Sequence, residues 1–482
     1  MAKHSLPWSL VAAAMLVVGL VGADFAPAAT NVVFIIADDL SAEALACYGN
    51  SQCRTPAIDR LAEQGLRFER AYSQFPVCGP SRAALMSGMY PQAIGVVGNG
   101  SSRQFTNNLG DRPSFSQHFK NHDYYTARVS KIYHMRVPGD ITAGVDGPDH
   151  HASWTERFNC QAPEWMSQGQ HAHLSHERLS RDPEKHYGLG FGTAFYVVKG
   201  NTNGAEQADD QAAEKAIEIL GEVKDKPFFL AVGFVRPHVP LVAPAEFYEP
   251  YPPTEMKLPA RWSDDWSDIP KAGISHNSQR IGFAGNSAKQ QEVLAAYYAS
   301  VAYMDYQVGR ILDALDELDL RKNTIVVFTS DHGYHLGEHD FWQKMSLHEE
   351  SVRIPLVISV PGKNPAVTES LSEQIDLFPT LSELCELTVP EHCQGVSLAP
   401  LFDDPNQVVR TEAYCMHGKG HLLRTNRWAY IEYRDGTQEL YDMLQDPKQF
   451  TNLAATGEHQ ETVQSLKQQL QAKLSEINSS QD

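Results

Sequence analysis

The chain has 482 residues, 42% of them hydrophobic, and a formal net charge of -19 at pH 7. This length and apolar content are enough for a large buried core, which excludes a disordered chain and indicates one large domain or a large domain with a smaller partner. The acidic charge repels polyanions at long range, so we expect neither nucleic acid nor an anionic membrane surface as the main partner.

Residues 1–23 have the pattern of a signal peptide. Lys3 precedes an apolar run over residues 10–20, and the small Ala23 suits cleavage. The run is too short to span a bilayer comfortably, and no later segment is long and apolar enough to do so. We therefore expect cleavage, export to the periplasm or the medium, and no membrane attachment afterwards. An uncleaved anchor is the alternative that this pattern leaves open.

The chain contains seven cysteines, an odd number for an exported protein, so at least one thiol is expected to be unpaired or specialised. Cys78 is the candidate for that role. Cys47 with Cys53, and Cys385 with Cys393, lie close enough in sequence to form small disulfide loops. The sequence does not determine the pairing.

Apolar, β-branched runs of strand length alternate with segments of helical periodicity. The expected strands cover residues 31–39, 228–235, 323–333 and 352–362. The expected helices cover residues 55–65, 208–223 and 291–318. This alternation predicts an α/β fold with a large, mostly parallel central sheet flanked by helices. Ligands gather beyond the carboxyl ends of such strands, where the sequence places Asp38, Asp39, His238, Asp331 and His332.

Two regions depart from this alternation. Residues 137–200 are rich in Gly, Pro, His and Asp, and we expect a large irregular loop over one side of the sheet. Its histidines show no ligand-like spacing, which favours a solvated loop over a metal site. Residues 381–476 contain a β-meander pattern with a turn at Asp435 and Gly436, then an amphipathic helix. We therefore expect a catalytic domain over 31–380, followed by a small C-terminal subdomain of antiparallel sheet and helix.

The stretch FPVCGPSRAALMSG, residues 75–88, places a cysteine at the start of an expected helix. Pro80 suits the first helical turn, and Gly88 suits the C-terminal end. Unpaired backbone N–H groups and the macrodipole favour an anion beside Cys78, and Arg82, one turn further on, can point to the same anion. A small buried cysteine beside an ordinary turn is the simpler alternative, but it leaves the rest of the pattern unexplained.

Cys78, Pro80, Ser81 and Arg82, with Gly88 six residues further on, resemble the motif of the formylglycine-dependent sulfatases, a family of the alkaline phosphatase superfamily. The resemblance implies a sulfatase-like α/β fold and a maturation enzyme that oxidises Cys78 to formylglycine. The hydrated aldehyde of formylglycine bears two geminal hydroxyls. A sulfated gem-diol can expel sulfate by collapsing to the aldehyde, whereas a sulfated serine depends on attack by water.

Further motifs between residues 31 and 452 resemble in particular the iduronate-2-sulfatase branch of that family. The resemblance implies a divalent cation, normally calcium, held by Asp38, Asp39, Cys78, Asp331 and His332. Hard carboxylate oxygens suit calcium, and the ion withdraws charge from a sulfate oxygen and from the nucleophile. Histidine is an unusual calcium ligand, so His332 is also expected to contact the nucleophile or another ligand.

Three short stretches supply the other expected catalytic residues: VSKIYHMR contains Lys131 and His134, VRPHVP contains His238, and FWQKMS contains Lys344. The resemblance implies that Arg82 and Lys131 steady the formylglycine and that His134 accepts the proton of its second hydroxyl. It also implies that His238 and Lys344 bind the sulfate or protonate the leaving oxygen. Fixed positive charge is needed there because the transition state loads negative charge onto the sulfuryl group and the leaving oxygen.

The expected substrate is a sulfated carbohydrate, and Tyr334 and Met345 are the expected substrate-binding residues beside the sulfate. The human member of the branch has tryptophan and tyrosine at these two positions, so sulfated uronic acids and other polysaccharide-derived sugars both stay open.

Two alternative functions are a phosphonate or phosphodiester hydrolase of the same superfamily and a non-catalytic protein that binds sulfated glycans. The phosphonate and phosphodiester hydrolases generally favour a transition metal. A non-catalytic glycan-binding protein usually lacks some of the reacting groups of the enzyme.

Overall fold

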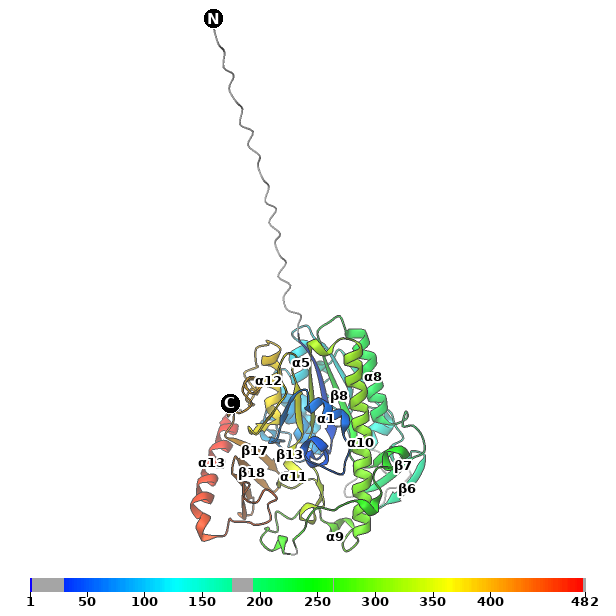
Figure 1. Cartoon of the computed structure of the whole chain (residues 1–482). Coiled ribbons are helices and arrows are strands. Elements are labelled where there is room, and N and C mark those ends of the chain that lie inside the picture. The colour runs from blue at the N-terminus through cyan, green and yellow to red at the C-terminus, as the bar shows by residue number, and fades with distance from the viewer. Residues whose placement is uncertain (2–29, 176–193, 263, 480–482) are drawn as a thin grey trace.

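The computed structural model describes Met1 and residues 30–175, 194–262 and 264–479. Its centre is a sheet of eight strands with helices on both faces (Figure 1). The strand order is β15-β2-β14-β10-β1-β8-β4-β5. The signal-peptide prediction for residues 1–23 falls outside the described residues, apart from Met1. No helix in the described ranges is long and apolar enough to cross a membrane.

The central sheet is mostly parallel, as the alternation of strands and helices predicts. Its strands are β1 (Asn31–Asp38), β2 (Leu66–Phe68), β4 (Tyr125–Ser130), β5 (Glu156–Phe158), β8 (Phe228–Pro237), β10 (Thr324–Ser330), β14 (Leu356–Ser359) and β15 (Ala366–Thr368). β1 pairs in parallel with β10 and β8, β8 with β4, and β4 with β5. β14 runs antiparallel to its neighbours β10 and β2. The predicted α/β class and the mostly parallel sheet are confirmed.

Helices bury both faces of the sheet. One face is covered by α8 (Ala208–Val223) and α10 (Ser287–Glu317), and the other by α2 (Cys78–Ser87), α5 (Phe115–Lys120) and α12 (Leu377–Leu384). Val33 and Ile35 of β1 pack on the side of α8 and α10, whereas Val32 and Phe34 pack on the opposite side. Since side chains alternate along a strand, β1 separates two apolar cores, and all of its side chains are buried.

Smaller elements surround this sheet. Further α-helices among the described residues are α1 (Pro56–Ala62), α3 (Pro91–Ile94), α4 (Phe105–Leu109), α6 (Gly139–Ala143), α9 (Ser278–Ile281) and α11 (Glu349–Val352). One three-stranded sheet joins β3 (Ala71–Tyr72), β13 (Arg353–Ile354) and β16 (Ser372–Glu373), and another joins β6 (Gly169–His173), β7 (Tyr196–Gly200) and β9 (Leu241–Pro244). A hairpin of β11 (His335–Leu336) and β12 (Trp342–Gln343) leads toward the candidate site.

The region 137–200 differs from the expected irregular loop. Within its described part, β5 extends the central sheet beside β4, and β6 and β7 form a pair that β9 joins. The strands of this region are short. The residues of β6 are mostly exposed and show no alternation of apolar and polar side chains, so the sequence of β6 predicts no strand. His176 and His186, two histidines of this region, lie outside the described residues.

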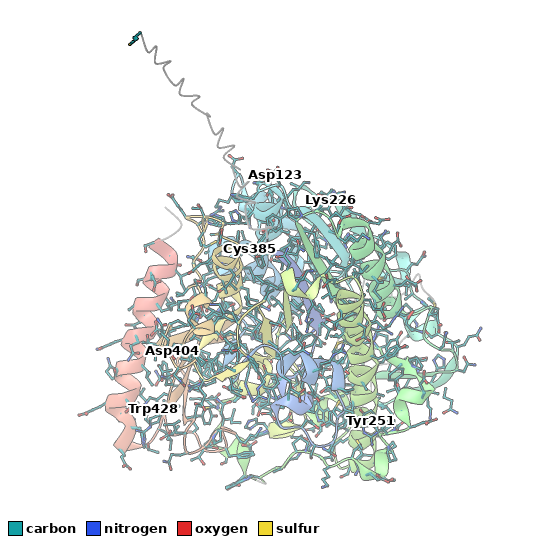
Figure 2. All side chains as sticks on the ribbon, turned by 45° about the horizontal axis from the view of Figure 1, so that its top comes forward. Asp123, Lys226, Tyr251, Cys385, Asp404 and Trp428 are labelled. Atoms are coloured by element: carbon teal, nitrogen blue, oxygen red, sulfur yellow. The ribbon has the colours of Figure 1, made fainter. Side chains whose placement is uncertain are left out.

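The C-terminal region contains the expected antiparallel sheet and helix. The strands are β17 (Glu412–His417), β18 (Gly420–Thr425), β19 (Trp428–Tyr433) and β20 (Gln438–Asp442), and the helix is α13 (Gln460–Ser479). In the turn between β19 and β20, Gly436 has a φ of +86°, which glycine adopts without strain. Leu466 and Leu470 of α13 share a buried cluster with Tyr430 of the sheet. Figure 2 shows Trp428 near the first turns of α13.

All seven cysteines belong to the described residues, and none forms a disulfide. Two buried thiols instead contact backbone carbonyls: Cys53 Sγ lies 3.9 Å from Tyr298 O, and Cys385 Sγ lies 3.6 Å from Thr30 O. The small disulfide loops considered from the sequence are therefore not present in the structure.

Candidate active site

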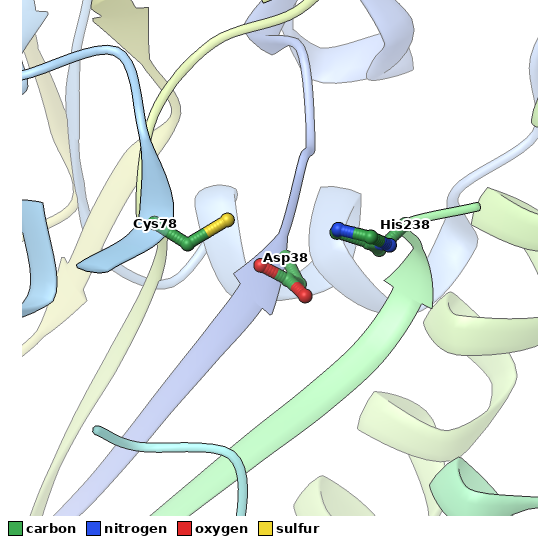
Figure 3. Close-up of side chains that lie close together, drawn as sticks. All are labelled: Asp38, Cys78 and His238. Atoms are coloured by element: carbon green, nitrogen blue, oxygen red, sulfur yellow. The ribbon is translucent and has the colours of Figure 1, made fainter. Parts of the chain in front are cut away.

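The candidate active site lies at the carboxyl edge of the central sheet, where the ends of β1, β8 and β10 meet the start of α2. Figure 3 shows Cys78 on α2, Asp38 at the end of β1 and His238 just after β8, with their side chains close together. β1 lies between β8 and β10, so the parallel strand ends bring together segments that are distant in the chain. The strand-end residues predicted from the sequence gather here: Asp38, Asp39, His238, Asp331 and His332.

Cys78 is the first residue of α2 and is buried. Its Sγ lies 3.1 Å from Lys344 Nζ and 3.4 Å from His332 Nε2. The carboxylate Oδ1 of Asp39 is 3.7 Å from the same sulfur. Burial and the charge of Asp38 raise the pKa of the Cys78 thiol well above its ordinary value. The unmodified side chain is therefore a neutral thiol and a poor nucleophile.

Three buried carboxylates, Asp38, Asp39 and Asp331, place oxygen atoms within 4.8 Å of one another. His332 adds a nitrogen: its Nδ1 donates to Gly333 O at 2.9 Å, and its Nε2 faces Asp39 Oδ1 at 3.3 Å. Mutual repulsion of buried carboxylates is costly, and oxygen donors at this spacing fit a hard divalent cation such as calcium. The residues predicted to hold a metal thus have a suitable donor set.

Lysine side chains also contact these carboxylates. Lys131 Nζ contacts Asp38 Oδ2, and Lys344 Nζ contacts Asp39 Oδ1. Burial acts to raise the pKa of Asp38, but Lys131 and the other nearby cations outweigh it and hold that pKa well below its ordinary value. Burial acts to lower the pKa of Lys344, but Asp39 outweighs it, and the pKa lies above its ordinary value. Asp38 and Lys344 are therefore both charged at neutral pH.

Arg82 is fully buried and joins three parts of the site. Its Nε donates to Asp331 Oδ2 at 2.9 Å, and its Nη2 donates to Asp38 Oδ1 at 3.3 Å. Its Nη1 donates to the backbone carbonyl of Lys131. Among the described residues, none of its hydrogen bonds goes to Cys78. The guanidinium thus fixes two carboxylates and the Lys131 backbone, and its direct contact with a modified residue 78 stays a prediction.

Two histidines of the site are neutral at neutral pH. Burial and Lys131 hold the pKa of His134 well below its ordinary value, and burial lowers the pKa of His238 to about 4. His134 Nδ1 is buried and has no hydrogen-bond partner in the described part of the chain. His238 Nε2 lies 3.8 Å from Asp39 Oδ2. A neutral imidazole can accept a proton, as the predicted role of His134 requires, whereas His238 would have to gain a proton before it could protonate a leaving oxygen.

Lys344 reaches the site from a strained turn. Gln343 and Met345, on either side of it, have φ values of +71° and +77°, in the left-handed region that is costly for residues other than glycine. Two neighbouring residues support the turn: Ser275 Oγ donates to Lys344 O at 3.2 Å, and His276 Nδ1 contacts Gln343 Oε1 at 3.1 Å. These contacts help to offset the strain and to fix the backbone that carries the Lys344 side chain.

Tyr297 is a buried residue of the site that the sequence patterns did not single out. Its hydroxyl donates to Asp39 O at 2.7 Å and accepts from Ser41 N at 3.0 Å. Asp39 has a φ of +64°, so these bonds hold a left-handed residue in place at the end of β1. The two partners of Tyr297 are 258 and 256 residues away in the chain, and helical periodicity alone does not distinguish it from its buried neighbours.

A cavity of about 880 Å³ opens onto this cluster. The predicted site residues on its wall are Asp39, Cys78, Lys131, His134, His238, Lys344 and Met345. Tyr334 does not line the cavity: its ring is buried and stacks on Tyr297, with centroids 5.3 Å apart. Met345 is 37% exposed and does line it. The substrate-binding roles of Tyr334 and Met345 stay predictions, and the placement of Met345 fits such a role more directly.

Comparisons with known proteins find similar sequences over most of the chain. A family model described as Sulfatase matches residues 30–387, and one described as N-sulphoglucosamine sulphohydrolase, C-terminal, matches residues 337–476. A sulfatase of Formosa agariphila is 31% identical over 460 residues, which cover 91% of this chain and 85% of the relative. The iduronate 2-sulfatase of Homo sapiens is 32% identical over 411 residues, which cover 76% of this chain and 70% of the relative.

The overall structure is also similar to that of a protein solved in complex with its substrate D-glucosamine-2-N,6-O-disulfate. The TM-score is 0.73 at 22% sequence identity, and the match covers 94% of this chain and 98% of the other. At this level of identity the likeness shows a shared fold.

Proposed function

The chain belongs to the sulfatase family of the alkaline phosphatase superfamily, and from this membership we propose that it hydrolyses sulfate monoesters on carbohydrates. The observation that carries the proposal is the surroundings of Cys78 Sγ, which has a lysine nitrogen at 3.1 Å, a histidine nitrogen at 3.4 Å and a carboxylate oxygen at 3.7 Å. A nucleophile at this position faces groups that stabilise negative charge and groups that hold a proton or a cation.

We propose formylglycine at position 78 and a calcium ion as the cofactors. The motif around Cys78 and the spacing of Asp38, Asp39 and Asp331 support this assignment, with His332 beside them. Once formed from Cys78, hydrated formylglycine would supply a nucleophilic hydroxyl, and a bound calcium ion would withdraw charge from the sulfate. Conversion of the cysteine requires an oxidising maturation enzyme, which we propose as a partner of the chain.

The roles proposed for the chain's other residues follow from their positions. Lys131 and Lys344 line the cavity and can bind sulfate oxygens, where negative charge develops in the transition state. His134 is neutral and can take a proton from the nucleophile side, and His238 can bind the sulfate or, once protonated, pass a proton to the leaving oxygen. Arg82 lies behind the cavity wall and acts by holding carboxylates in place.

The proposed substrate is a sulfated uronic acid or another polysaccharide-derived sugar. The cavity of about 880 Å³ is large enough for a sugar ring in addition to the sulfate group. The similarity to an iduronate 2-sulfatase supports a sulfated sugar. The pattern of residues 1–23 supports export, so we also propose a periplasmic or secreted enzyme that is not attached to the membrane after cleavage.

The test is the release of inorganic sulfate from a panel of sulfated oligosaccharides by protein that is produced together with a maturation enzyme. Mass spectrometry of the peptide containing residue 78 reports the modification, because formylglycine is about 18 Da lighter than cysteine. Cys78→Ala should be inactive, and Cys78→Ser should become sulfated and turn over very slowly. Full multiple turnover by Cys78→Ser would contradict the proposal. Binding of sulfated glycans without any sulfate release would favour a non-catalytic protein.

A further inference from the structure

The wall of the active-site cavity extends beyond the predicted catalytic residues and carries further charges. The carboxylate of Asp140 pairs with Arg136 at 2.5 Å. Those of Asp146 and Asp149 pair with Arg128 at 2.5 and 3.1 Å. Most of the charged groups on this wall thus have an opposite charge beside them and are not free to bind a charged ligand.

Arg103 is the exception. It lines the cavity and is exposed. Over the described ranges of the chain, no carboxylate lies within 4.0 Å of its guanidinium, and no hydrogen bond holds that group. On an ordinary surface such an arginine is simply solvated. On the wall of a cavity that binds one anionic group, it can pair with a second anionic group of the same ligand.

The backbone that carries Arg103 is fixed to the start of α2. Arg103 belongs to a short 3-10 helix, η3 (Asn99–Gln104). Asn99 Oδ1 accepts a hydrogen bond of 2.8 Å from the backbone N of Gly79, the residue directly after the nucleophile. A Cβ atom at Gly79 would lie only 2.3 Å from Ser102 Oγ, so the two segments approach each other closely.

The C-terminal side of η3 is fixed as well. The ring of Phe105, which follows η3, is buried and packs edge-to-face on Tyr133 with centroids 5.1 Å apart. Arg103 therefore lies between two anchored positions, and its Cα has a defined place relative to residue 78. Specificity contacts are typically carried by rigid segments of this kind.

We propose that Arg103 is a specificity-determining residue that binds a second anionic group of the sugar, a carboxylate or a second sulfate, while the first sulfate lies at residue 78. This inference rests on the proposed function and narrows its substrate class to sugars with at least two negative charges. The planar guanidinium can donate two parallel hydrogen bonds to either group, which lysine cannot do.

Two pairs of substrates test the inference, and the members of each pair differ in one negative charge. The first pair is a 2-O-sulfated uronic acid disaccharide and its carboxyl-reduced form, and the second is a disulfated hexosamine and its monosulfated form. Arg103→Gln should lower kcat/KM about 10- to 100-fold for the more charged member of at least one pair, and change the other member less than about twofold. The pair that responds identifies the second group as carboxylate or sulfate.

Gln104→Ala is the matched control, because Gln104 is exposed, adjoins Arg103 in η3 and does not line the cavity. Arg103→Lys keeps the charge and should recover part of the loss. Equal losses on both members of each pair, or no loss on any substrate, would overturn the inference. If the wild-type protein released sulfate from none of the four substrates, the result would instead contradict the proposed function, and with it the inference.

Discussion

Replacing Tyr297 by phenylalanine tests how the protein holds Asp39, one of the residues proposed to bind the cation. The variant removes a single oxygen atom and keeps the ring that packs on Tyr334. That oxygen is fully buried, donates to Asp39 O at 2.7 Å and accepts from Ser41 N at 3.0 Å. Its loss leaves a buried backbone carbonyl and a buried backbone N–H without their partner.

Two effects of different size are expected. A buried polar group without a partner costs about 1–3 kcal/mol, so the free energy of unfolding should fall by about 3 kcal/mol for the two groups together. Asp39 has a φ of +64°, and without the tyrosine bond its backbone can relax and turn the carboxylate away. Residues that orient metal ligands contribute about 10- to 100-fold to affinity, so the Kd for calcium should rise about tenfold or more.

Isothermal titration calorimetry on chelator-treated protein measures the calcium affinity, and denaturant unfolding measures the stability. Tyr334→Phe is the matched control, because Tyr334 is buried against the same ring, and its hydroxyl has no hydrogen bond to any residue that the structure describes. We expect the control to change both quantities much less. An unchanged calcium Kd in Tyr297→Phe would refute the positioning role, even if the stability falls as expected.

Three further outcomes are expected at the site. Lys344→Ala should lower kcat/KM about 30- to 1000-fold on every sulfated sugar, since its contact with the transition state is expected to contribute about 2–4 kcal/mol; a loss confined to one sugar would contradict this role. Chelation should lower both sulfate release and melting temperature, and calcium should restore both, whereas restoration by zinc alone would indicate phosphohydrolase chemistry. Gly79→Ala should displace η3, because its Cβ would lie 2.3 Å from Ser102 Oγ, and unchanged rates on all sugars would show that η3 adapts.

The position of the site could be predicted because parallel strands end at one edge of a sheet. The apolar runs before Asp38 and Asp331 identify two of these strands, and the polar residues that follow a third include His238. Cys78 could be placed at a helix start from Pro80 and Gly88, and Gly88 ends α2 with a φ of +68°. Local patterns of one or two elements were sufficient for each of these predictions.

The supporting contacts could not be predicted in this way. Tyr297 and Ser275 contact the site through long-range packing, and neither lies in a motif of reactive residues. The short strands β5 and β6 have no apolar alternation, because β6 is largely exposed and both lie at sheet edges. Nearness in sequence suggested that Cys47 could pair with Cys53, but a disulfide requires a specific geometry of both side chains that spacing does not determine.

Asp305 is a buried carboxyl group whose ionisation should make stability depend on pH. It lies on α10, is 2% exposed, and accepts hydrogen bonds from the backbone N of Ala57 and Ile58 at 3.0 and 2.8 Å. Burial raises the pKa of Asp305 to about 7. In an unfolded chain the pKa of aspartate is about 4, so the folded state binds the proton more tightly. The stabilising contribution of this group is therefore complete below about pH 4 and is lost as the pH rises to about 7.

Asp305→Asn keeps the size of the side chain and removes its ionisation, so the variant should gain stability relative to the wild type as the pH rises. The asparagine has one acceptor oxygen in place of two, and the variant should therefore be the less stable protein at pH 5.

Between about pH 5 and 8 the unfolding free energy of the variant should rise relative to that of the wild type by about 3 kcal/mol, because each pKa unit corresponds to about 1.4 kcal/mol. Denaturant unfolding of both proteins at several pH values measures this difference, in which the titration of all other groups cancels. A difference that stays constant with pH would show that Asp305 ionises in the folded protein at its ordinary pKa, and that its two backbone hydrogen bonds compensate for its burial.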